Sequence, residues 1–356
     1  MIKTFKILLL PFSLVYGSIL YVRNKLYDWN ILKTISYEFP VISIGNLALG
    51  GTGKTPHIEY LIRLLQKDYK IAILSRGYKR TTKGFLLADE NSNVSNIGDE
   101  PLQYKLKFKK ILVAVDEKRV HGINKIKKNY SKTDVILLDD AYQHRSVNPN
   151  INILITEYNN LYINDTTIPA GRLREWGTGS KRADIIIVSK TKNNLTLNEK
   201  EKIISQINPL PHQKVYFSFI KYEKITSFTK KAKDIEKILN LDYSVLLLTG
   251  IAKPTALFNT ISNQYKHLEH IKFSDHHNFK NLDILKIKDA YKKLKGNNKI
   301  IISTEKDIMR LSLPKILNQL QDIPIFYIPI EICFHGNDQK DFDNQILKYV
   351  TKNSRN

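Results

Sequence analysis

The chain has 356 residues, of which 42% are hydrophobic and 25% are charged. This balance is typical of globular proteins and excludes a disordered chain, and the length allows two modest domains. Lys and Arg number 56 against 34 Asp and Glu, so the formal charge is +22. A field of this sign attracts nucleic acid, anionic lipid or phosphorylated substrates. Because the lysines are spread along the chain, a general compositional bias explains the charge equally well.

The first thirty residues differ from the rest. Residues 7–22 carry no charge and are flanked by Lys3, Lys6, Arg23 and Lys25. A membrane span needs roughly 20 apolar residues, and no cleavage site suits a signal peptide. Aromatic side chains suited to a membrane interface occur here: Tyr16, Tyr21, Tyr27 and Trp29. The pattern favours a helix lying in or shallowly entering a membrane over a full span or an ordinary core helix.

Short apolar runs follow Pro40 and alternate with segments of helical period. The expected strands are 41–44, 71–74, 111–115, 135–138, 151–155 and 185–188. Runs this uniformly apolar are what a parallel sheet covered on both faces requires. Between the first two lies an amphipathic helix with Ile58, Leu61, Ile62 and Leu65 on one face. The alternation predicts an α/β domain.

The second half of the chain predicts a smaller α/β domain. Residues 190–211 are polar and read as a surface connection or a helical excursion, and 341–356 as a helix with a frayed tail. The strands 245–248 and 299–303 lie between two further strand-like stretches, 215–222 and 326–334, which we interpret as a two-stranded linker. The expected parts are a membrane-associated helix over 1–30, the first domain over 31–214 and the second over 215–356. The single cysteine, Cys333, excludes a disulfide framework and fits a reducing compartment.

The segment 45–55 has the pattern of a phosphate-binding loop. It stands between a strand and a helix, which is the context that such a loop requires. Its glycines let backbone N–H groups face phosphate oxygens at the positive end of the helix. Lys54 is expected to reach the β- and γ-phosphates and Thr55 to bind Mg²⁺, while Ala48 replaces the usual first glycine. The expected nucleotide-binding residues are Gly50, Gly51, Thr52, Gly53, Lys54 and Thr55.

Two carboxylates follow the strand 135–138. Asp139 and Asp140 stand where the metal-holding acid of a phosphate-loop protein is expected, and either could bind Mg²⁺. The Asn/Thr-Lys-x-Asp motif that recognises guanine is absent, because residues 189–192 lack the final Asp of that motif. ATP is therefore the expected nucleotide, with Mg²⁺ as cofactor.

Several motifs together resemble the tetraacyldisaccharide 4'-kinase (lipid A 4'-kinase) family. The phosphate loop, including its Ala48 position, is similar to that of the family. The family usually has Gly-Phe where Ala141 and Tyr142 stand. The other matching segments are 74–78, 98–101, 139–144, 169–175, 249–254, 275–277 and 304–307.

This resemblance implies a reaction and a place in the cell. The expected reaction transfers the γ-phosphoryl group of ATP to the 4'-hydroxyl of tetraacyldisaccharide 1-phosphate and yields lipid IVA. The expected location is the cytoplasmic face of the inner membrane, on its surface or anchored by the N-terminal helix. The resemblance also implies two α/β lobes on a two-stranded linker. We expect neither a nucleic acid nor an obligate protein partner.

The resemblance also implies roles for individual residues. Asp99 matches the family's proposed base, and His276 matches its partner, although His277 is chemically able as well. Arg174 is expected to stabilise charge on the transferred phosphoryl group, and Glu175 to orient it or the metal shell. Without the resemblance, these residues read as a turn former, a loop or metal site, and a surface ion pair. Weaker expectations are lipid-phosphate or nucleotide contacts by Arg76 and Arg119, and roles for Gln143 and His144.

Three other functions compete with this interpretation. Another phosphate-loop kinase or ligase would act on a different acceptor. A nucleic-acid-binding ATPase would explain the charge, but no basic stripe with interleaved aromatic residues is present. A membrane-attached nucleotide switch would leave Asp99 and the 275–277 motif without a task.

Overall fold

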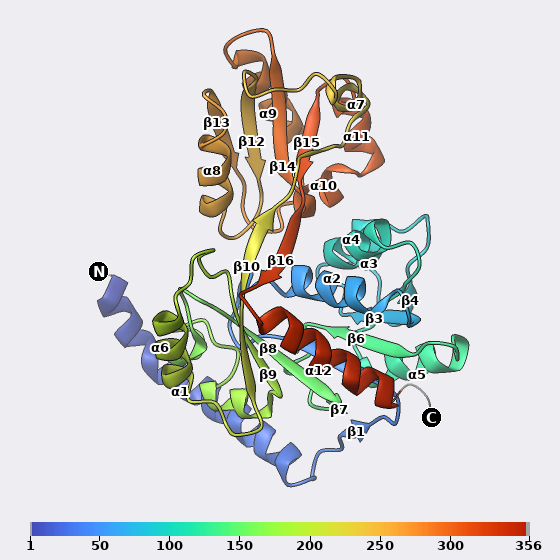
Figure 1. The fold of residues 1–356 in the computed structure, drawn as a ribbon, viewed down its shortest axis with the longest axis vertical. Helices are drawn as coiled ribbons and strands as arrows, with labels where there is room; N and C mark the ends of the chain where they lie inside the picture. The colour runs from blue at the N-terminus through green and yellow to red at the C-terminus, as the bar shows by residue number, and fades with distance from the viewer. Residues whose placement is uncertain (1, 354–356) are drawn as a thin grey trace.

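The computed structural model describes residues 2–353 and arranges them around two main sheets (Figure 1). A two-stranded ribbon of β1 (Ile35–Ser36) and β7 (Val147–Asn148) lies apart from both. The larger sheet has nine strands in the order β16-β10-β9-β8-β2-β6-β3-β5-β4. In that order they are Ile330–Phe334, Lys214–Tyr222, Ile185–Ser189, Ile151–Glu157, Val41–Gly45, Val135–Asp139, Ile71–Ser75, Leu112–Val115 and Leu86–Leu87.

The larger sheet is parallel except at its two edges. Neighbouring strands from β10 to β5 pair in parallel, whereas β16 and β4 pair antiparallel. The central strands are buried along their whole length, which explains their uniformly apolar sequences. Helices cover the sheet: α2 (Lys54–Leu65), α3 (Val94–Ile97), α4 (Asp99–Lys107), α5 (Arg119–Asn129), α6 (Leu197–Ile207) and α12 (Asp338–Asn353). The first six predicted strands are thus confirmed.

The smaller sheet forms the core of a second lobe. Its strands run in the order β11-β15-β14-β12-β13, and all but β11 are parallel. They are Thr226–Ser227, Ile325–Ile328, Lys299–Thr304, Ser244–Thr249 and Leu268–Lys272. The helices here are α7 (Lys230–Ile235), α8 (Thr255–Ser262), α9 (Asn281–Lys293), α10 (Glu305–Leu311) and α11 (Pro314–Leu320). Sequence analysis missed β13, because it alternates apolar with charged residues on a half-exposed edge.

Two antiparallel strands connect the lobes. β10 leaves the larger sheet and pairs with the returning β16, from Ser218 opposite Phe334 to Tyr222 opposite Ile330 (Figure 1). The single strand predicted over 326–334 is wrong, because the run divides at Pro329. Proline has no N–H for a ladder hydrogen bond, so β15 ends in the smaller sheet and β16 begins in the larger one.

Helix α1 (Ile2–Asp28) carries an exposed apolar surface. Its segment Lys6–Asp28 has a mean hydropathy of 1.4, and only 11% of the most apolar stretch is buried, so length and composition suffice for a membrane span. Ser13 fixes the helix to the first lobe, because its hydroxyl accepts from Ala170 N and its carbonyl from the Thr167 hydroxyl, both at 2.8 Å. The polar stretch 190–211 contains α6, and the tail expected at 354–356 lies outside the described residues.

Candidate active site

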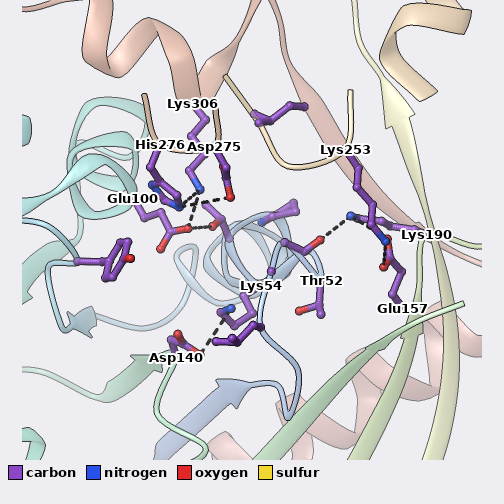
Figure 2. Close-up of a pocket in the computed structure, with 18 of the residues that line it drawn as sticks. Thr52, Lys54, Glu100, Asp140, Glu157, Lys190, Lys253, Asp275, His276 and Lys306 are labelled. Carbon is purple, nitrogen blue, oxygen red and sulfur yellow. Dashed lines mark hydrogen bonds and ion pairs between the residues drawn. The ribbon is translucent and has the colours of Figure 1, made fainter. Parts of the chain in front are cut away.

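A cleft of about 1090 Å³ opens between the two lobes. The phosphate loop forms its floor, and the second lobe contributes Lys253, His276 and Lys306 to its walls (Figure 2). Helix α1 also reaches it through Tyr16 and Arg23. The carboxyl ends of parallel strands are where an open α/β sheet positions its ligands, and β2, β6 and β3 all end here.

Positive φ angles and two hydrogen bonds fix the conformation of the phosphate loop. Gly50 and Gly53 have φ values of +108° and +95°, which side chains larger than hydrogen rarely adopt. The Asn46 amide donates to the Thr52 hydroxyl at 2.9 Å, and the Ser189 hydroxyl donates to the Thr52 carbonyl at 2.7 Å. Gly53 is the N-cap residue of α2, so the unpaired amides of the first helical turn lie where the loop lines the cleft.

Lys54 and Thr55 begin helix α2 at the cleft floor. The Lys54 ammonium lies 3.5 Å from both Asn46 Oδ1 and Asp140 Oδ1. The Thr55 hydroxyl donates to Glu100 Oε1 at 3.2 Å. These weak contacts leave both groups ready to exchange their partners for phosphate oxygens and a metal ion.

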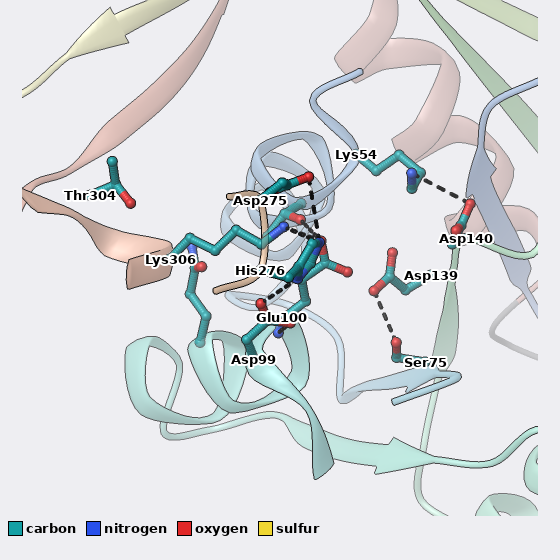
Figure 3. A network of polar contacts seen from close by, with 12 residues as sticks. Lys54, Ser75, Asp99, Glu100, Asp139, Asp140, Asp275, His276, Thr304 and Lys306 are labelled. Atoms are coloured by element: carbon teal, nitrogen blue, oxygen red, sulfur yellow. Dashed lines mark hydrogen bonds and ion pairs between the residues drawn. The ribbon is translucent and has the colours of Figure 1, made fainter. Parts of the chain in front are cut away.

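The two carboxylates at the end of β6, Asp139 within the strand and Asp140 after it, have different surroundings. Asp139 is fully buried and accepts from the Ser75 hydroxyl at 3.1 Å, while its Oδ1 has no hydrogen-bond partner (Figure 3). Burial, with the charges of Glu100 and Asp140, raises the pKa of Asp139 above the usual range. Burial also opposes ionisation of Asp140, but the charges of Lys54 and Arg174 outweigh it and lower its pKa.

These residues fit a Mg²⁺ ion held together with nucleotide phosphates. A cation near the unpaired Oδ1 of Asp139 would compensate the buried charge, and the Thr55 hydroxyl lies on the same floor. No cluster of three or more metal-binding side chains occurs among residues 2–353. Mg²⁺ bound to a nucleotide needs none, because it keeps several waters and takes phosphate oxygens as ligands.

Across the cleft, four side chains from three segments form one polar network, and Figure 3 shows three of them, Asp99, His276 and Lys306. His276 Nδ1 lies 2.8 Å from Asp99 Oδ2, and Lys306 Nζ lies 2.9 Å from His276 Nε2. Arg310 donates to the same Asp99 oxygen at 2.5 Å. Asp99 begins α4, whereas Lys306 and Arg310 belong to α10 of the second lobe. The structure therefore brings Asp99 together with His276.

The network controls the charge of Asp99. Burial would raise the pKa of Asp99, but the hydrogen bond from His276 and the charges of Lys306 and Arg310 outweigh it. They hold the pKa well below the usual carboxyl range, so Asp99 is ionised. The Asp99 side chain is only 4% exposed and lies behind His276, whose ring lines the cleft. His277 instead contacts Asp283 of α9 at 2.9 Å.

Arg174 lies beside the phosphate loop because its own strand segment pairs with that loop. Its backbone N–H donates to the Leu47 carbonyl at 2.6 Å, and Ala48 forms an isolated bridge with Leu173. The guanidinium contacts both oxygens of Asp140 at 2.9 and 3.0 Å. This arrangement aims a fixed positive charge at the cleft floor.

Glu175 does not contact the Arg174 side chain. Its carboxylate accepts from Asn24 of α1 at 2.7 Å, from Arg182 at 2.8 Å and from Gln143 at 3.1 Å. The alternative interpretation of Arg174 and Glu175 as a surface ion pair is therefore wrong, since Glu175 is 3% exposed and pairs with Arg182. Its contacts join α1 to the cleft floor.

Of the weaker expectations, Arg76, Gln143 and His144 line the cleft, whereas the buried Arg119 does not. Arg119 donates to the backbone carbonyls of Asp116 and Asp139 and so supports the end of β6.

Sequence reasoning missed the charged residues that join the lobes. Glu157, at the end of β8, accepts from Lys190 at 3.2 Å and from Lys253 of the second lobe at 2.5 Å (Figure 2). On the opposite side, Lys107 of α4 contacts Glu305 of α10 at 2.6 Å. The motif at 304–307 marks part of this set, but no spacing rule links residues so distant in the chain.

Comparison with known proteins gives one consistent family. The model of the family described as "Tetraacyldisaccharide-1-P 4'-kinase" matches residues 5–351. A tetraacyldisaccharide 4'-kinase of Phocaeicola vulgatus is 46% identical over 98% of this chain and 96% of its own length. That of Flavobacterium johnsoniae is 44% identical over 97% of both chains. The crystal structure of "apo" form LpxK from Aquifex aeolicus in complex with ATP superposes with a TM-score of 0.73 at 26% identity, covering 97% of this chain and 99% of that one.

The parallel sheet, the phosphate loop and the carboxylates after β6 define a phosphate-loop protein of the kinase class. The second lobe adds a charged pair across the cleft, as expected for an enzyme that must also position an acceptor. The chain belongs to the tetraacyldisaccharide 4'-kinase family.

Proposed function

We propose that this chain transfers the γ-phosphoryl group of ATP to the 4'-hydroxyl of tetraacyldisaccharide 1-phosphate, the step that yields lipid IVA. The observation that carries the proposal is the meeting of two half-sites in one cleft. The phosphate loop and Asp140 lie on the floor, with Asp139 buried next to Asp140, and His276 lies on the wall with Asp99 buried behind it. Family membership favours this acceptor over that of another membrane-associated phosphate-loop kinase.

The floor of the cleft has the groups that ATP requires. Amides of residues 50–53 and the Lys54 ammonium would bind the phosphates, and Arg174 would offset charge on the transferred group. Thr55 with Asp139 or Asp140 would hold Mg²⁺, which neutralises phosphate charge when bound. Little covalent chemistry is then left to the protein beyond alignment.

The wall of the cleft would receive the proton of the sugar hydroxyl. Asp99 is the expected base and His276 its partner, and the contact between them is short. The lowered pKa makes Asp99 a weak base. A weak base suffices, because the transition state of phosphoryl transfer is loose in most analyses and the proton leaves late. The chief contribution of the pair is then to orient the hydroxyl and hold its proton.

Helix α1 would bring the cleft to a lipid surface. Its exposed side includes Ile7, Leu8 and Phe12, each at least 63% exposed. The helix also lines the cleft through Tyr16, so a lipid held along it could present its sugar to the floor. We place the protein at the cytoplasmic face of the inner membrane, with residues 1–30 as the anchor. The expected division into 31–214 and 215–356 needs adjustment, because β10, β16 and α12 belong to the larger sheet and its cover. The proposed kinase domain therefore comprises 31–222 with 330–353, and the smaller domain comprises 223–329.

A mixed-micelle assay with labelled ATP, Mg²⁺ and tetraacyldisaccharide 1-phosphate tests the proposal. We expect label in the lipid with the wild type, and its loss in Lys54→Ala and in Asp99→Ala. Lys192→Ala is the matched control, because Lys192 is exposed and pairs with Glu199 on the surface. ATP hydrolysis without lipid labelling would refute the proposed acceptor.

A further inference from the structure

Lys306 has no role in the proposed chemistry, although it contacts the pair at its centre. It is the second residue of α10, and its ammonium lies 2.9 Å from His276 Nε2 and 3.4 Å from Glu100 Oε1. Burial alone would lower the pKa of Lys306, but the carboxylates of Glu100, Asp99 and Asp275 outweigh it and raise the pKa above the usual lysine value. Lys306 is therefore a charged donor.

The contacts define which nitrogen of His276 carries the proton. An ammonium has only donors, so Nε2 must accept from Lys306. An ionised carboxylate has only acceptors, so Nδ1 must carry the N–H that Asp99 receives. Arg310 Nη2 lies 3.3 Å from Nδ1, but since that nitrogen is protonated, Arg310 donates to Asp99 instead. Both nitrogens of the ring are thus committed.

We infer that Lys306 is a positioning residue that keeps His276 neutral, with its single N–H directed at Asp99. A histidine beside a carboxylate ordinarily attracts a second proton, because the negative charge stabilises imidazolium. Here Lys306 occupies the lone pair on Nε2 and adds a like charge to any proton that would bind there. This inference rests on the proposed function, in which Asp99 needs its negative charge to receive the hydroxyl proton.

Both negatively and positively charged groups surround His276. Asp275 Oδ2 lies 4.0 Å from Nε2, and the ring of Tyr78 meets the imidazole edge-on. Without Lys306, the Asp275 carboxylate would remain beside Nε2 and would favour imidazolium. The titratable groups that contact the ring are Asp99 from α4, Asp275 and Tyr78 from loops, and Lys306 and Arg310 from α10, while Glu100 of α4 contacts the Lys306 ammonium.

An imidazolium would weaken the site. It would place a full positive charge beside Asp99, which already accepts a hydrogen bond from Arg310. The carboxylate would then have a lower affinity for the proton of the hydroxyl. Substituting Lys306 by methionine keeps most of its volume and removes the donor. Lys306→Arg restores a donor that cannot accept. Lys293→Met, on the exposed surface of α9, controls for loss of a lysine in the same lobe.

The first test reads the ring directly. Long-range ¹H–¹⁵N correlation of the full chain labelled at histidine reports each ring nitrogen, and the His276 signals are those lost in His276→Gln. At pH 6 we expect one protonated and one unprotonated nitrogen in the wild type, in Lys306→Arg and in Lys293→Met. We expect both to be protonated in Lys306→Met. Identical His276 signals in Lys306→Met and the wild type would overturn the inference.

The second test is the pH dependence of kcat in the micelle assay. In Lys306→Met we expect the acid limb to move to higher pH, with a loss of about tenfold or more at pH 6 that shrinks as pH rises to 8.5. Lys306→Arg should retain the wild-type limb. An unchanged limb with a raised KM for ATP would instead make Lys306 a phosphate contact and overturn the inference. If the wild type labels no lipid, the proposed function fails, and the nitrogen signals still decide the state of His276.

Discussion

The burial of His57 leads to a prediction about how acid pH changes the stability of the fold. The residue is buried in α2, where Nδ1 lies 2.7 Å from the Gly53 carbonyl and Nε2 lies 2.9 Å from the Ser218 hydroxyl of β10. The carbonyl can only accept, so Nδ1 carries the proton and Nε2 accepts from Ser218. His57 thus connects the end of the phosphate loop to the strand that leads into the second lobe.

The size of the expected loss in folding stability follows from the pKa of His57. Burial lowers the pKa of His57 from 6.5 to about 4, and the hydrogen bond to Gly53 opposes this only in part. The unfolded chain therefore binds more protons than the folded chain between these values. Stability from this group is fully present above pH 6.5 and is lost as pH falls toward 4. A difference of about 2.5 units corresponds to about 3 kcal/mol at 1.36 kcal/mol per unit.

The measurement compares urea unfolding of the wild type and His57→Gln at pH 7 and pH 4.5. Glutamine supplies a donor and an acceptor but does not titrate. We expect the wild type to lose about 2–3 kcal/mol more than the variant between the two values. His267→Gln is the control, because His267 is an exposed histidine in the second lobe. Equal losses in wild type and His57→Gln would refute the reasoning.

Three further predictions concern the cleft. Lys54→Met should lower kcat for lipid phosphorylation about 10²–10³-fold, as measured by steady-state labelling, because a preorganised donor is removed; a smaller loss than tenfold would contradict its role. Arg174→Ala should lower kcat/KM more than Arg174→Lys does, since lysine keeps the charge but not the planar fork; equal losses in the two variants would show that the charge alone contributes nothing, and no loss in Arg174→Lys would make the fork irrelevant. Lys253→Met should change the free energy of unfolding by less than about 1 kcal/mol, because the side chain is 49% exposed where it pairs with Glu157; a larger change in urea titrations would show a structural ion pair.

The local parts of the site could be predicted from sequence. The strand, loop and helix at 41–65 are contiguous, so their residue types and spacing determine the geometry of the phosphate loop. Asp139 could be predicted because it directly follows a buried strand, and parallel strands end at one edge of their sheet. Hydrophobic period and burial act within a few residues, and the strands and the helix predicted there are confirmed.

The non-local parts could not be predicted in the same way. Arg310 reaches Asp99 across 211 positions, and Lys107 reaches Glu305 across 198. Such contacts depend on how two lobes meet, which no local pattern encodes. The division of 326–334 into two strands at Pro329 depends on the missing N–H of proline, which a hydropathy pattern does not reveal. Glu175 shows the same limit, since its partners come from α1 and from Arg182.

The product of the reaction tests the central claim most directly. Wild-type protein is incubated with Mg²⁺-ATP and tetraacyldisaccharide 1-phosphate in micelles, and ¹H–³¹P correlation locates the new phosphate. The account predicts a bis-phosphorylated lipid with its second phosphate on the 4'-oxygen, formed by the wild type and not by Lys54→Ala. A phosphate at another position, or phosphorylation that survives in Lys54→Ala, would contradict it.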